Sequence, residues 1–143
     1  MDFPEKFLGN LVEEGNLYFF LKDSPIGIPE HIHICIKRND SFLLFSTCSS
    51  QTDPAFRLAQ LKGWDMNTFP VFPKNEENKF KKEHTYVNCN NVIEISDTEF
   101  GKLIRSGKVR LLDGHISELG LQLIGNGVKL STEVERRIKA LFE

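Results

Sequence analysis

Residues 30–51, EHIHICIKRNDSFLLFSTCSSQ, carry the pattern that most constrains the fold. Two runs with the composition of β-strands flank a short polar segment, Arg38 to Ser41, whose residue types accept tight turns. The pattern therefore predicts a β-hairpin. Because strand side chains alternate between two faces, His31, His33 and Cys35 are expected on one face and the neighbouring isoleucines on the other. We expect the rest of the chain to be built on this hairpin.

The remaining segments predict further strands and several helices. Apolar residues at helical spacing, bounded by capping residues and glycines, predict helices within residues 2–15, 54–63, 96–107, 117–127 and 132–142. Shorter apolar runs predict strands at residues 16–21, 68–72, 85–87, 91–95 and 109–112. Prolines restrict 68–72 to a sheet edge, and the polar residues 88–91 suggest a bend. The fold class is therefore α+β: one domain, residues 1–143, with a small antiparallel sheet or barrel, an inserted helix and C-terminal helices.

The formal net charge of -2 gives the whole molecule no basic field that would attract nucleic acid. Nucleic-acid binding would therefore need a local basic patch. Two groups of basic residues are candidates: Lys37 and Arg38 on the hairpin, and Lys74, Lys79, Lys81 and Lys82 in the charged segment 74–82. These side chains would contact a phosphate backbone if the charged segment lies beside the hairpin. The alternative for the charged segment, which glutamates interrupt, is a solvated loop.

The three cysteines, Cys35, Cys48 and Cys89, are odd in number and widely spaced. This argues against a disulfide framework and favours a reducing cytoplasm. No run of about eighteen apolar residues predicts a membrane span. The first residues also lack the basic start and apolar block of a secretory signal. We therefore expect a cytoplasmic protein that is not attached to a membrane.

His31 and His33 are the first candidates for chemistry, because imidazole exchanges protons near neutral pH. Two imidazoles on one strand face would serve as general base and general acid. They would instead hold a metal if Cys35 or His84 supplied a third ligand. A third interpretation is that both rings only form hydrogen bonds at a strand edge. The loop of residues 22–29, rich in proline and glycine, is either a connector or a flap over this site.

The second candidate is the run Thr47, Cys48, Ser49 and Ser50, where the hairpin ends. Hydroxyl groups beside turn N–H groups can hold a phosphate or a developing oxyanion. A nucleophilic serine or cysteine with a histidine as base is conceivable. No GxSxG elbow accompanies it, which argues against acyl transfer. The alternative is a polar turn that leads into a helix cap.

Four segments follow one another in a familiar order: HIHICIKRND at residues 31–40, FLLFSTCSSQ at 42–51, VIEISDTEF at 92–100 and GHISELGL at 114–121. Over roughly residues 16–142, this order resembles the MazF/PemK-like toxin endoribonuclease family. The resemblance implies an SH3-like barrel with a C-terminal helix. It also implies a homodimer that cuts single-stranded RNA without a metal or other cofactor and that a partner antitoxin protein silences.

The resemblance assigns roles to particular residues of the hairpin. Ser49 or Ser50 matches the hydroxyl that supports the reacting phosphate. The catalytic arginine of the family falls near His31 to His33, where this chain has no arginine. Histidine can replace an acid or base there but not a permanent positive charge. The helix predicted within residues 54–63 also exceeds the family plan.

The leading hypothesis is a cytoplasmic, toxin-like endoribonuclease. Either His31 or His33 would take the ribose 2′-hydroxyl proton, and the other imidazole, or Lys37, would assist the leaving oxygen. Ser49 and Ser50 would hold the phosphate. The RNA-binding residues would be Lys37, Arg38, Lys81 and Lys82. The alternatives are a non-catalytic protein-interaction module built on the small barrel, and a metal-dependent enzyme that uses both histidines.

Overall fold

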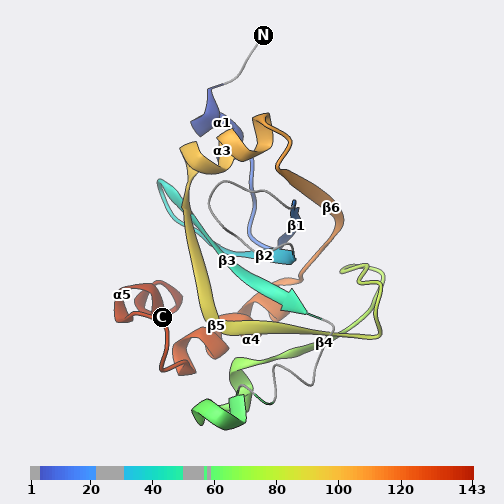
Figure 1. Cartoon of the computed structure of the whole chain (residues 1–143), viewed down its shortest axis with the longest axis vertical. Coiled ribbons are helices and arrows are strands. Elements are labelled where there is room, and N and C mark those ends of the chain that lie inside the picture. The colour runs from blue at the N-terminus through green and yellow to red at the C-terminus, as the bar shows by residue number, and fades with distance from the viewer. Residues whose placement is uncertain (1–3, 22–30, 50–56, 58) are drawn as a thin grey trace.

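The computed structural model of the chain describes residues 4–21, 31–49, 57 and 59–143, and for Lys6 the backbone alone. Figure 1 shows the arrangement of the elements. In chain order they are α1 (Glu5–Asn10), β1 (Asn16–Phe20), β2 (Ile32–Arg38), β3 (Phe42–Ser49), the 3-10 turn η1 (Met66–Thr68), β4 (Val71–Pro73), β5 (His84–Ser96), α3 (Asp97–Arg105), β6 (Val109–His115), α4 (Glu118–Leu130), α5 (Arg136–Lys139) and η2 (Ala140–Phe142). Residues 57 and 59–62 are also helical, within the predicted inserted helix, whose beginning lies outside the described residues.

The strands form one antiparallel sheet in the order β4-β5-β3-β2-β1-β6. The sheet curls into half a barrel, with α1 and α3 at one end and α4 and α5 toward the other (Figure 1). The predicted α+β class, with a small barrel-like antiparallel sheet and added helices, is confirmed. The predicted hairpin is also confirmed, because β2 pairs with β3 across the Asn39–Ser41 turn.

Both faces of the hairpin are buried, each in its own core. Ile34 and Leu44 face a core that α4 and α5 complete with Ile124, Val128 and Ile138. Cys35 and Phe45 face a second core, which α3 completes with Phe100 and Leu103. The sheet is therefore covered on both sides. Because of this, a polar side chain in the middle of β2 is buried whichever face it takes.

The long strand β5 bends where the polar residues 88–91 predict a bend. Ser46 of β3 pairs with Val92, but the next residue, Thr47, pairs with Asn88, so three residues of β5 bulge out between the two pairs. Buried Asn90 holds the bulge in place. Its Nδ2 donates to Thr68 Oγ1 at 2.8 Å, and its Oδ1 accepts from Ser131 Oγ at 2.7 Å. One bent strand therefore replaces the two short strands predicted on either side of it.

The helix ends divide into those predicted well and those predicted badly. The side chains of Ser96 and Ser117 cap α3 and α4 as predicted. Each hydroxyl oxygen accepts a hydrogen bond of 3.1 Å from the backbone N–H three residues later in the chain. The prediction that α4 stops within Gly125–Gly127 is wrong, because α4 continues to Leu130. Gly127 serves close packing instead: a Cβ there would lie 2.7 Å from the Cys89 sulfur. The single helix predicted over 132–142 is also wrong, because only the short α5 and η2 form there.

The helices α1 and α3 pack backbone against backbone. A Cβ on Gly9 would overlap the main-chain carbonyl of Asp97, and a Cβ on Gly101 would overlap that of Glu5. Neither position accepts a larger residue unless the helices move apart. This contact places the α3 N-terminus over the end of β2, where Arg38 lies.

Candidate active site

A pocket of about 590 Å³ opens where the start of β2, the end of β3 and the strands β1 and β6 meet the segment after Asn78. Apolar side chains line part of it: Leu17, Phe19, Ile32, Phe80 and Leu112. Exposed polar and charged side chains line the rest: His31, Lys79, Lys81, Lys82, Arg110 and Asp113, together with half-buried Ser49. Such a concave apolar surface with a few converging polar groups is typical of a ligand site.

The basic loop, Lys79–Lys82, forms one wall of this pocket. Asn78 holds it from inside the fold, where this side chain is 4% exposed. The Asn78 Oδ1 accepts from the Asn75 and Phe80 N–H groups at 3.1 and 3.0 Å, and the Asn78 Nδ2 donates to the Pro73 carbonyl at 3.0 Å. Phe80 is 6% exposed and belongs to the core beneath α4. The lysines of the loop are exposed, as the alternative of a solvated loop predicts, but Asn78 and Phe80 anchor the loop to the fold.

Two backbone features fix the basic loop against β6. Lys79 has φ 53°, the left-handed region in which side chains other than glycine and asparagine are uncommon. A Cβ on Gly114 would overlap the Asn78 carbonyl, so β6 and the loop are in direct backbone contact. Strained residues gather at functional sites. The lysines of the loop are thus presented by a defined backbone rather than by a free chain.

His31 and Ser49 lie at this pocket, each at the edge of a central strand. His31 immediately precedes β2, which begins at Ile32, and Ser49 is the last residue of β3. His31 is exposed, and both residues line the pocket. The structure therefore brings together four of the predicted site residues: His31, Ser49, Lys81 and Lys82. Ser50 and the predicted flap of residues 22–29 lie outside the described residues.

His33 lies on the opposite side of the sheet and does not reach this pocket. Its side chain is fully buried, and its ring centre lies 4.6 Å from that of Phe20, edge to face. The His33 Nδ1–H donates to the His31 carbonyl at 2.9 Å, while the buried Nε2 has no hydrogen-bond partner among the described residues. Burial lowers the pKa of His33 to about 4, because the charged ring would lose its hydration. The predicted pair of histidines on one strand face is therefore wrong.

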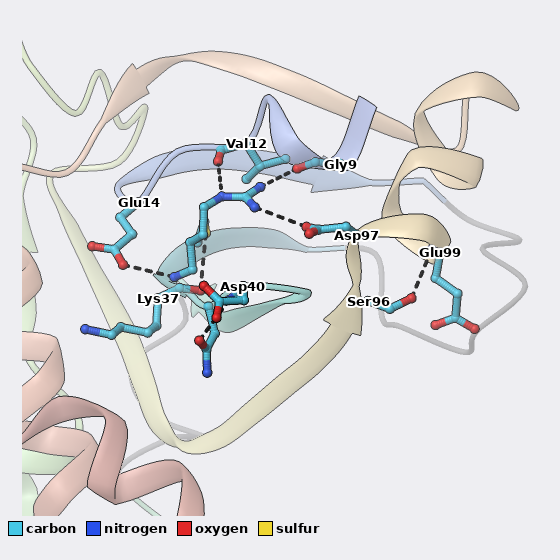
Figure 2. Close-up of polar contacts among 11 residues, drawn as sticks. Gly9, Val12, Glu14, Lys37, Asp40, Ser96, Asp97 and Glu99 are labelled. Carbon is cyan, nitrogen blue, oxygen red and sulfur yellow. Dashed lines mark hydrogen bonds and ion pairs between the residues drawn. The ribbon is translucent and has the colours of Figure 1, made fainter. Parts of the chain in front are cut away.

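The guanidinium of Arg38 is bonded within the protein, to groups of Gly9, Val12 and Asp97, which Figure 2 labels. Its Nη1 lies 3.2 Å from Asp97 Oδ1, Nε donates to the Val12 carbonyl at 2.7 Å, and Nη2 donates to the Gly9 carbonyl. Lys37 extends away from this cluster, with Nζ 5.8 Å from the centre of the Phe142 ring. Neither residue lines the pocket. Lys37 and Arg38 therefore lie outside the pocket that Lys81 and Lys82 line, and binding of RNA by all four residues stays a prediction.

In the described part of the chain, neither the cysteine thiols nor a cluster of metal-binding side chains forms a second candidate active site. Burial raises the pKa values of Cys35 and Cys89 to about 12, and raises that of Cys48 further, so none supplies a thiolate near neutral pH. Among the described residues, no three histidine, cysteine or acidic side chains gather as metal ligands. Nothing in the described part of the chain therefore supports a nucleophilic Cys48 or a metal held by His31 and His33.

Arg110 and Asp113 were missed in the sequence, although both line the pocket. They lie on β6, which pairs with β1, and Arg110 is directly opposite Phe19 in that ladder. The alternation of Arg110 with apolar neighbours was a signal that this arginine takes the other strand face. The pairing of β6 with β1 could not be predicted from the sequence, because about 90 residues separate the two strands.

None of the described helices is long and apolar enough to cross a membrane. Comparison of the chain with known protein families finds no matching family model, and no curated protein matches it.

Proposed function

We propose that the protein binds single-stranded RNA in this pocket and cleaves it without a metal, with His31 as general base. The observation that carries the proposal is the set of side chains at one pocket: an exposed imidazole, a serine, and lysines on an ordered loop. The lysines complement phosphates, and the apolar lining accommodates a base or ribose. The resemblance of the chain order to MazF/PemK-like toxins supports the same activity.

The chemistry needs three roles, and the pocket has a residue for each. His31 removes the proton from a ribose 2′-hydroxyl, whose oxygen then bonds to the adjacent phosphorus. Ser49 donates to a phosphate oxygen as negative charge develops on it. The bond from phosphorus to the 5′-oxygen breaks, and Lys81 or Lys82 gives that oxygen a proton. The products are a 2′,3′-cyclic phosphate and a 5′-hydroxyl, and no water or metal takes part in this step.

The decisive experiment incubates the purified protein with a mixed single-stranded RNA in a chelator. We expect cleavage that leaves cyclic phosphate ends, and a fall of roughly 10²–10⁴-fold in rate for His31→Ala, the usual effect of losing a general base. The matched control is His84→Ala, since His84 is also exposed but does not line the pocket. Absence of cleavage by the unaltered protein, or equal rates for the His31 and His84 variants, refutes the activity.

The contribution of the basic loop is measured separately by binding. Each phosphate contact on a single strand contributes about 0.7 to the slope of log affinity against log salt. The double variant Lys81→Ala, Lys82→Ala should therefore reduce the slope by about 1.4. The control variant Lys102→Ala, Lys129→Ala removes two exposed lysines elsewhere and should leave the slope unchanged. Equal slopes for the two double variants contradict RNA binding by the loop.

A second candidate function, self-association, is favoured by the exposed face of α4. Leu119, Leu123 and Leu130 are 77%, 49% and 48% exposed, at the spacing of a coiled-coil seam that also contains Asn126. A groove of about 550 Å³ beside them is lined by residues that include Met66, Val71 and Leu123. A surface that holds both a ridge and a groove suits a second copy of itself.

The charges on α4 favour an antiparallel second copy. Glu118 begins the helix and Lys129 lies in its last turn, so two antiparallel copies set opposite charges against each other at both ends. We expect a homodimer in light scattering that Leu123→Glu converts to a monomer. Leu111→Glu, at an exposed leucine of β6, is the control and should leave the dimer intact. A monomer at micromolar concentration overturns this candidate, and an antitoxin partner stays a prediction from the resemblance.

A further inference from the structure

We infer that the pocket selects guanine, which stacks on Arg110 and presents its Watson–Crick edge to Asp113. The inference rests on the proposed binding of RNA and adds the identity of the base. It comes from two features that the cleavage step does not use: a guanidinium already seated on an aromatic ring, and an acidic side chain in a pocket otherwise rich in lysines.

Arg110 and Phe19 form a stacking platform. The guanidinium carbon of Arg110 lies 5.5 Å from the centre of the Phe19 ring, and the two residues are paired across β6 and β1. At this distance the cation is attracted to the face of the ring, and Arg110 remains exposed at the pocket. Unpaired RNA bases stack on such guanidinium planes. The platform alone accepts any base.

Asp113 is the residue that distinguishes the bases. A carboxylate repels the RNA backbone, so its presence at an RNA site is unfavourable unless it accepts hydrogen bonds from the ligand. In single-stranded RNA those donors are the N–H groups of the bases and the ribose hydroxyls. Among the described residues Asp113 has no ion-pair partner that would occupy it. Within the described part of the chain, no hydrogen bond or ion pair occupies its two oxygens, and we expect both to bind the ligand.

Guanine fits a carboxylate better than the other bases do. Its N1–H and N2–H groups are adjacent and point the same way, so both oxygens of one carboxylate accept from it. Adenine, cytosine and uracil each present a single donor nitrogen on that edge. Three residues apart, Arg110 and Asp113 would face opposite sides of a regular strand, but the pairing of β6 with β1 shifts between Leu111 and His115, and both residues line the pocket. A purine stacked on the arginine therefore shares the pocket with the aspartate side chain.

The test measures binding of GMP, IMP, AMP, CMP and UMP by titration calorimetry. IMP is the sharpest probe because it differs from GMP only by lacking the 2-amino group. We expect GMP to bind about 10-fold more tightly than each of the others, within the range for a bidentate contact. Asp113→Asn should abolish this preference, because an amide offers one acceptor and one donor. Arg110→Ala should weaken all five nucleotides alike.

Each result separates the inference from the function on which it rests. Equal binding of GMP and IMP, or a guanine preference that persists in Asp113→Asn, overturns guanine selection and leaves RNA binding standing. No binding of any nucleotide overturns both. Unchanged affinities for all five nucleotides in Arg110→Ala refute the platform. Asp113 and Arg110 are exposed, so thermal unfolding should show both variants folded.

Discussion

Acidification should destabilise the protein through His33. The pKa of a histidine in an unfolded chain is about 6.5, and burial lowers that of His33 to about 4 in the folded state. The folded state therefore resists protonation that the unfolded chain accepts. The contribution of uncharged His33 to the free energy of unfolding is fully present above pH 6.5 and is lost as the pH falls toward about 4. A difference of about 2.5 pKa units corresponds to about 3 kcal/mol of unfolding free energy, of which about 2 is lost by pH 5.

The test compares the unaltered protein with His33→Leu by urea unfolding at pH 7 and pH 5. The leucine removes the titrating ring, and with it an Nε2 that has no partner in the described part of the chain and an Nδ1 that bonds the His31 carbonyl at 2.9 Å. Because these two losses oppose each other, we expect the free energy of unfolding at pH 7 to change by about 1 kcal/mol or less. Between pH 7 and pH 5, the unaltered protein should lose about 2 kcal/mol more than this variant.

His84→Ala is the control, because it removes an exposed histidine and should follow the unaltered protein. Carboxylates also titrate in this range, but they are common to all three proteins and cancel in the comparison. Parallel stability curves for the unaltered protein and His33→Leu would refute the reasoning. An NMR titration that gave the His33 ring a pKa near 6.5 would refute it directly.

Three further predictions concern the residues that hold the fold and the pocket. Arg38→Met should destabilise the protein by about 3 kcal/mol in urea unfolding, because it leaves the carboxylate of Asp97, which is 1% exposed, without its cation; Arg105→Met, at a solvent-exposed ion pair, should cost less than about 1 kcal/mol. Asn78→Ala should lose three hydrogen bonds and about 2–3 kcal/mol, and should weaken RNA binding although Asn78 carries no charge. All three buried cysteines should resist a thiol reagent in the native protein and react together in urea, and labelling of a native cysteine would contradict their burial.

Local chemistry made part of the fold predictable. The hairpin follows from two apolar runs and a turn, and the caps at Ser96 and Ser117 follow from the serine itself. The position of β4 at the sheet edge follows from its prolines, since proline cannot donate to a second neighbour strand. In each case the deciding residues are within a few positions of one another.

The site was only half predictable because strand pairing is not local. Alternation correctly placed His33 with Cys35, but the strand begins one residue too late for His31 to share that face. A sheet buried on both sides then turned His33 into a core residue. Arg110 reaches the pocket only because β6 pairs with β1. Arg38 has the appearance of a surface cation in the sequence, and nothing near it in the chain indicates its partner Asp97.

The packing of α1 on α3 has a consequence for the time at which the protein can fold. The exposed ion pair between Glu5 and Arg105 joins residues 100 positions apart, and β1 pairs with β6 over a similar distance. During synthesis, α1 and β1 emerge long before α3 and β6 exist, although β2, the other neighbour of β1, follows soon after it. Contacts of such long sequence separation slow folding, because the loop between them must close first. We expect ribosome-bound chains that end before β6 to remain sensitive to protease, even though most of the sheet has already been made.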